Sequence, residues 1–139
     1  MSREIEEFAK ILVEWVRDAA IRSNDSVFAG RHAIAKRWKE AAASSSPEEF
    51  AKVLIPDIVD STIAHLLGAI DQEVLRLSFT AANGKSVDLA TATDGLSGLY
   101  GAEWCEEYTK ERFIDDFADL EDFFNKAPAG DPGYLAYGD

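Results

Sequence analysis

Four side chains that could hold a metal ion or move a proton fall close together in the chain, namely Asp57, Asp60, His65 and Asp71. On a helix, Asp57 and Asp60 lie about one turn apart, and the other two lie within about 80° of Asp57 around the axis. A small metal-dependent or hydrolytic enzyme could be built on such a helix. The spacing matches no known metal motif, however, and Asp57 follows Pro56, where it could cap a restarted helix. We expect capping and ordinary polar contacts here.

Other patterns that could carry chemistry are incomplete. Cys105 is the only cysteine, so no structural zinc site of cysteine and histidine is expected. Beside Trp104 it is expected to pack as a small apolar side chain. There is no G-x-S-x-G motif for a serine nucleophile. The tripeptide 84–86 (Gly-Lys-Ser) resembles the end of a phosphate-binding loop, but Phe79 stands where that motif needs glycine. We therefore assign no catalytic residue, metal or cofactor.

Apolar periodicity predicts four helical segments in the first half of the chain. They are expected over residues 2–22, 27–43, 46–56 and 57–72. The apolar stripe of the first consists of Ile5, Phe8, Leu12, Trp15 and Ala19. Ser46 and Glu49 form a capping box with Pro47 at the first helical position. Pro56 is expected to kink or break the chain, because it removes a helical hydrogen bond.

The pattern then changes to a period of two residues, which is typical of strands. Apolar and polar residues alternate over 75–80 and again at 87–89, and Asn83-Gly84 between them is a strong hairpin turn signal. After this hairpin, Thr91–Ala102 is rich in glycine and is expected to be an irregular loop.

The segment Thr109–Lys126 predicts an amphipathic last helix. Its apolar stripe repeats at steps of four, three and four and consists of Phe113, Phe117, Leu120 and Phe124. Its other side carries Glu111, Asp115, Asp116, Asp119 and Asp122. Carboxylates one turn apart repel each other, so this row indicates a positive counterpart within the protein or on a partner. The internal candidate is the basic stretch 22–39, which contains Arg22, Arg31, Lys36, Arg37 and Lys39.

These elements predict a mostly helical α+β fold, with about five helices and one β-hairpin between the fourth and the last. We expect residues 1–139 to form one globular domain, with an irregular tail over 126–139 that contains proline and glycine. No apolar run approaches the ~18 residues of a membrane span, and no signal peptide is expected. With a single cysteine, the chain is expected in the cytoplasm, as a monomer or homodimer.

The charge is strongly negative and unevenly distributed. The net charge is −12, from 26 acidic and 14 basic residues, and residues 102–139 alone hold 11 acids against 3 bases. Nucleic acids and anionic membranes are therefore disfavoured as partners, whereas a basic protein is favoured.

The sequence thus predicts protein binding without catalysis. We interpret the chain as an inhibitor of the immunity or antitoxin type, which neutralises a basic, nucleic-acid-directed bacterial protein. The residues predicted to bind the partner are Glu103, Glu107, Glu111, Asp115, Asp119 and Asp122, with Tyr100 and Trp104 as aromatic anchors. The alternative is the small enzyme built on the helix that carries Asp57, Asp60, His65 and Asp71.

Overall fold

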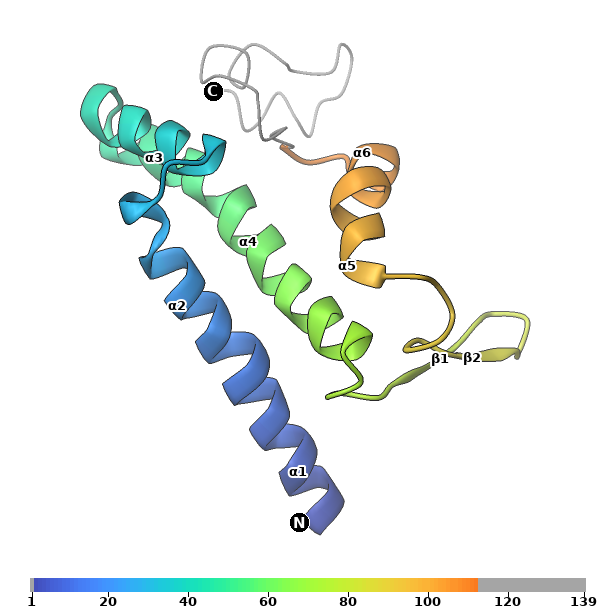
Figure 1. Ribbon diagram of the computed structural model, residues 1–139. Coiled ribbons are helices and arrows are strands. Elements are labelled where there is room, and N and C mark those ends of the chain that lie inside the picture. The colour runs from blue at the N-terminus through green and yellow to red at the C-terminus, as the bar shows by residue number, and fades with distance from the viewer. Residues whose placement is uncertain (1, 113–139) are drawn as a thin grey trace.

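The computed structural model describes residues 2–112, which form four continuous helical rods and one β-hairpin (Figure 1). The first rod joins α1 (Arg3–Ile11), a π-helical stretch (Leu12–Asp18) and α2 (Ala19–Asp25). The next two rods are α3 (Ala33–Ser44) and α4 (Pro47–Asp71). The fourth joins α5 (Leu96–Leu99), a π-helical stretch (Tyr100–Trp104) and α6 (Cys105–Tyr108). The mostly helical α+β class is confirmed, although the expected number of helices is not.

α4 is one uninterrupted helix, so of the kink or break expected at Pro56 the break is wrong. Its start is as predicted: the Ser46 hydroxyl accepts a hydrogen bond from the Glu49 amide at 3.2 Å, and Pro47 is the first helical residue. Further along, Val53 and Pro56 are both buried. Tertiary packing around the proline therefore compensates for the hydrogen bond that its ring removes.

α4 lies at the centre of the described fold. The first rod runs along one side of α4 and the 96–108 rod lies along another, while α3 packs near its N-terminal end (Figure 1). Two apolar clusters form around it. One contains Val27, Ala35, Trp38, Ala41 and Val53, and the other contains Val16, Ala69, Ile70, Leu75 and Leu96.

α4 also meets the length and hydropathy criteria of a membrane span, contrary to the expectation that no apolar run approaches that length. The continuity of the helix through Pro56 makes the apolar segment long enough. Its most apolar stretch has a mean hydropathy of 1.5. The central helix of a water-soluble protein meets the same criteria, so length and hydropathy do not by themselves assign α4 to a membrane.

The second helix begins later than predicted. Residues Val27–Ala29 form a single 3₁₀ turn, and the chain is extended at Gly30 before α3 starts at Ala33. His32 is the residue that caps α3, because its Nδ1 accepts a hydrogen bond from the Ala35 amide at 3.2 Å. One of the two histidines of the chain therefore has a structural role.

The stripe predicted for the first helix is not its buried side. Four residues of this stripe have exposed fractions between 38% and 52%, namely Ile5, Phe8, Leu12 and Trp15. The buried residues of this rod are Val16 and Ala20. The rod therefore packs against α4 through a neighbouring side, which the periodicity of one helix does not specify.

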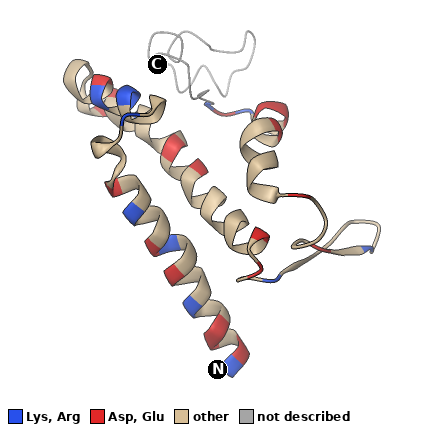
Figure 2. Ribbon diagram, viewed as in Figure 1, with Lys and Arg blue, Asp and Glu red and all other residues tan. Residues whose placement is uncertain are grey.

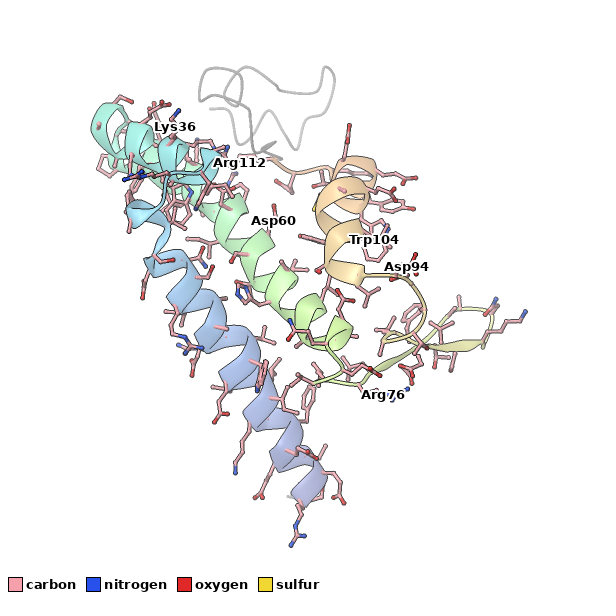
Figure 3. All side chains as sticks on the ribbon, in the orientation of Figure 1. Lys36, Asp60, Arg76, Asp94, Trp104 and Arg112 are labelled. Atoms are coloured by element: carbon pink, nitrogen blue, oxygen red, sulfur yellow. The ribbon has the colours of Figure 1, made fainter. Side chains whose placement is uncertain are left out.

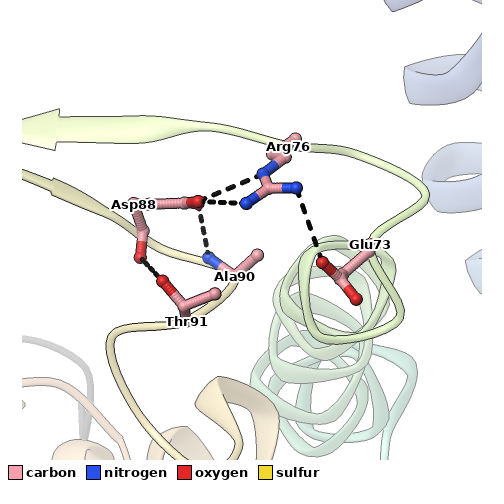
Figure 4. A network of polar contacts seen from close by, with 5 residues as sticks. All are labelled: Glu73, Arg76, Asp88, Ala90 and Thr91. Atoms are coloured by element: carbon pink, nitrogen blue, oxygen red, sulfur yellow. Dashed lines mark hydrogen bonds and ion pairs between the residues drawn. The ribbon is translucent and has the colours of Figure 1, made fainter.

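The predicted hairpin is present. Strands β1 (Ser78–Thr80) and β2 (Ser86–Asp88) pair antiparallel, and Gly84 in the turn has a positive φ of 85°. Arg76 donates hydrogen bonds to Asp88 and lies 3.6 Å from the Glu73 carboxylate, so it ties β2 to the end of α4 (Figure 4).

Part of the predicted glycine-rich loop is helical instead. The carboxylate of Asp71, at the end of α4, accepts hydrogen bonds from the backbone amides of Leu96 and Ser97 at 2.7 and 3.0 Å, and from the Ser97 hydroxyl. This long-range cap satisfies amides at the start of α5 and starts a helix in a segment of poor helix propensity.

The cap predicts a pH-dependent contribution to stability. Burial alone would raise the pKa of Asp71, but the hydrogen bonds from Ser97 and Leu96 hold its pKa below the ordinary value of 3.8. Its contribution is therefore complete above pH 3.8 and is lost as the pH falls through the lower pKa of the folded state. We expect Asp71→Ala to reduce the free energy of unfolding by about 1–2 kcal/mol at pH 7, and by less at pH 3, in urea titrations.

Asp94→Ala is the matched control, because it removes an exposed carboxylate near the same helix start. It should change stability by less than about 0.5 kcal/mol. Equal losses in the two variants would contradict the capping role.

Candidate functional site

An apolar groove with a volume of about 700 Å³ opens between α4 and the 96–108 rod. It is lined by Ile55, Pro56, Val59, Asp60, Tyr100, Trp104, Cys105, Tyr108, Thr109, Glu111 and Arg112. Figure 3 shows Asp60 on α4 and Trp104 on the facing rod. Binding sites are commonly apolar concavities with a few polar groups, so this groove is the candidate functional site.

Two rows of side chains form the walls of the groove. On α4, Ile55 and Val59 are four residues apart, and on the opposite rod Tyr100, Trp104 and Tyr108 follow at the same spacing. Residues four apart share one side of a helix. Each wall is therefore a continuous apolar ridge.

The polar groups in the groove form one small cluster. The Tyr100 hydroxyl donates a hydrogen bond to the Asp60 carboxylate at 2.6 Å, and the Cys105 sulfur lies 4.0 Å from the same oxygen. Burial and the bond to Asp60 raise the pKa of Tyr100 far above its ordinary value, and burial raises the pKa of Cys105. Both groups therefore keep their protons at neutral pH, and the thiol is not activated as a nucleophile.

Asp57, three residues before Asp60, belongs to a buried ion pair outside the groove. The Arg37 guanidinium, 2% exposed, lies 3.2 Å from Asp57, and the Trp38 indole donates a hydrogen bond to Asp57 at 2.7 Å. Burial raises the pKa of Asp57, while Trp38 and the positive charge of Arg37 oppose that increase. Arg37 belongs to the basic stretch expected to face the acidic helix, and among the described residues it pairs with this carboxylate. Most of the acidic helix lies outside the described residues, so its pairing with this stretch stays a prediction.

The four residues of the alternative enzyme site have separate contacts. Asp57 pairs with Arg37, Asp60 binds Tyr100, and Asp71 caps α5. His65 Nδ1 lies 2.7 Å from the carbonyl oxygen of Ser61, one turn back on its own helix. Within residues 2–112, no three histidine, cysteine, aspartate or glutamate side chains come close enough to hold a metal ion.

The predicted partner-binding residues fall into three groups. Tyr100, Trp104 and Glu111 line the groove. Glu103 and Glu107 are exposed on the 96–108 rod, and acidic positions on α6 are visible in Figure 2. Asp115, Asp119 and Asp122 lie outside the described residues.

Sequence reasoning missed the α4 wall of the groove and the Asp60–Tyr100 hydrogen bond. The aromatic spacing over 100–108 could have indicated a helical ridge, but Thr91–Ala102 was interpreted as a loop because of its glycines. The helix expected over 109–126 is not helical at Thr109–Arg112, and its remainder lies outside the described residues.

Comparisons with protein-family models, with curated proteins and with solved structures find no match to this chain.

The buried ion pair gives a stability prediction. We expect Asp57→Ala to reduce the free energy of unfolding by about 3–5 kcal/mol, because it removes one member of a buried ion pair and the acceptor of the Trp38 indole. Asp60→Ala, on the same helix, removes the acceptor of the Tyr100 hydroxyl and should reduce the free energy of unfolding by about 1 kcal/mol. Urea unfolding of both variants at pH 7 measures the difference, and a larger loss in the Asp60 variant would contradict our assignment.

Proposed function

We propose that this protein is an acidic protein-binding module, which inhibits a basic, nucleic-acid-directed protein in the manner of an immunity or antitoxin protein. Proteins that act on nucleic acids carry basic surfaces because they bind phosphates. An acidic partner can approach such a surface rapidly, cover it and exclude the nucleic acid. An inhibitor of this kind would act in the cytoplasm.

The observation that carries the proposal is the division of the 96–108 rod into two sides. Tyr100 and Trp104 line the groove, whereas Glu103, Glu106 and Glu107 are exposed to solvent. The aromatic side supports the rod within the protein and leaves the acidic side free to contact a partner. Tyr100 and Trp104, which the sequence predicts as anchors for the partner, would therefore hold this rod in place from the groove.

The same surface would continue past Tyr108. Glu111 lies at the groove, and the predicted acidic positions Asp115, Asp119 and Asp122 follow in the sequence. A row of carboxylates of this length gives a binding energy that depends on ionic strength, because salt screens exposed charges.

The test begins with affinity capture from the native host at 50 and 500 mM NaCl, two conditions that differ strongly in screening. A basic protein retained at low salt is then purified, and its affinity is measured by calorimetry. We expect reversal of three acids to lysine, at Glu103, Glu107 and Glu111, to weaken binding by at least about tenfold.

The matched control reverses three exposed acids on a distant helix, namely Glu4, Glu6 and Glu7. The two variants have the same net charge, so only the position of the change differs. If both variants lose affinity equally, net charge and not this surface determines binding. Absence of a captured basic protein at low salt would reject the proposed function.

A further inference from the structure

The walls of the groove expose an unusual amount of apolar surface. Ile55 and Val59 each have an exposed fraction of 49%, and Tyr108 reaches 70%. These side chains lie together along one concavity and are not scattered over the surface. A contiguous apolar surface of this kind indicates that something covers it.

The course of the chain indicates what covers it. After Tyr108 the backbone becomes extended at Thr109, and Glu111 and Arg112 line the same groove. Consecutive Cα atoms are about 3.8 Å apart, so the segment that begins at residue 113 starts beside the groove and needs no linker to reach it.

The sequence of that segment is complementary to the groove. Its apolar residues recur at steps of four, three and four, which places them on one side of a helix. They are Phe113, Phe117, Leu120 and Phe124. The stripe is about 16 Å long on a helix and would present aromatic rings to the two apolar ridges.

We propose that residues 113–124 of this same chain occupy the groove through this apolar stripe. Asp115, Asp119 and Asp122 are on the opposite side of such a helix, so docking would direct them away from the groove. The proposal goes beyond the proposed function and does not depend on it, because it concerns the purified chain without a partner.

Cys105 provides a native probe, because its sulfur lies in the groove and it is the only cysteine of the chain. Its rate of alkylation by iodoacetamide reports whether the groove is covered. Introducing two charges into the stripe, by Phe117→Asp with Leu120→Asp, should accelerate alkylation by at least about tenfold, since the groove would be open more often.

The control introduces the same two charges off the stripe, by Ala118→Asp with Asn125→Asp, and should leave the rate unchanged. Equal rates in the wild type and both variants would overturn the proposal. Circular dichroism of all three proteins verifies that the helical fold persists.

A second variant keeps the proposal testable if the charged stripe impairs folding. Phe117→Cys should form an intramolecular disulfide with Cys105 on mild oxidation, whereas Ala118→Cys should not. Failure of both cross-links, or equal yields, would overturn the proposal. So would protection of Cys105 that increases with protein concentration together with a dimeric solution mass, since a second copy would then be the occupant.

Discussion

The continuity of α4 is the constraint on which the rest of the described structure depends. Val53 belongs to one apolar cluster, and Ala69 and Ile70 belong to the other. Because all three are on one rigid helix, α3 and the 96–108 rod are held at fixed positions relative to each other. A break at Pro56 would uncouple the two clusters and remove the wall of the groove that Ile55 and Val59 form.

Three carboxylates of α4 make separate structural contacts along the helix. Asp57 compensates the buried charge of Arg37, Asp60 receives the Tyr100 hydroxyl, and Asp71 starts α5. Each contact joins α4 to a different part of the chain. Three of the four residues that suggested an enzyme therefore make polar contacts that position neighbouring elements, and buried or half-buried carboxylates usually have their hydrogen bonds satisfied in this way.

The groove and the acidic surface are two consequences of one helical arrangement. On the 96–108 rod, Tyr100 and Trp104 line the groove beside α4, whereas Glu103, Glu106 and Glu107 are exposed to solvent. One rod therefore carries both apolar side chains that line a groove and acidic side chains that stay hydrated. This division is the physical basis of both proposals.

The sequence by itself determined the fold class, the start of α4 at Ser46 and the hairpin with its turn at Gly84, since capping, period and turn chemistry are local properties. Only the tertiary structure decided that α4 continues through Pro56, that Val16 and Ala20 are buried in place of the predicted stripe, and that a helix begins at Leu96. Each of these depends on contacts between residues distant in the sequence: packing around the proline, the choice of helix face, and a cap that Asp71 supplies from another helix. The groove could not be predicted for the same reason, because its two walls meet only after α4 and the 96–108 rod have packed together.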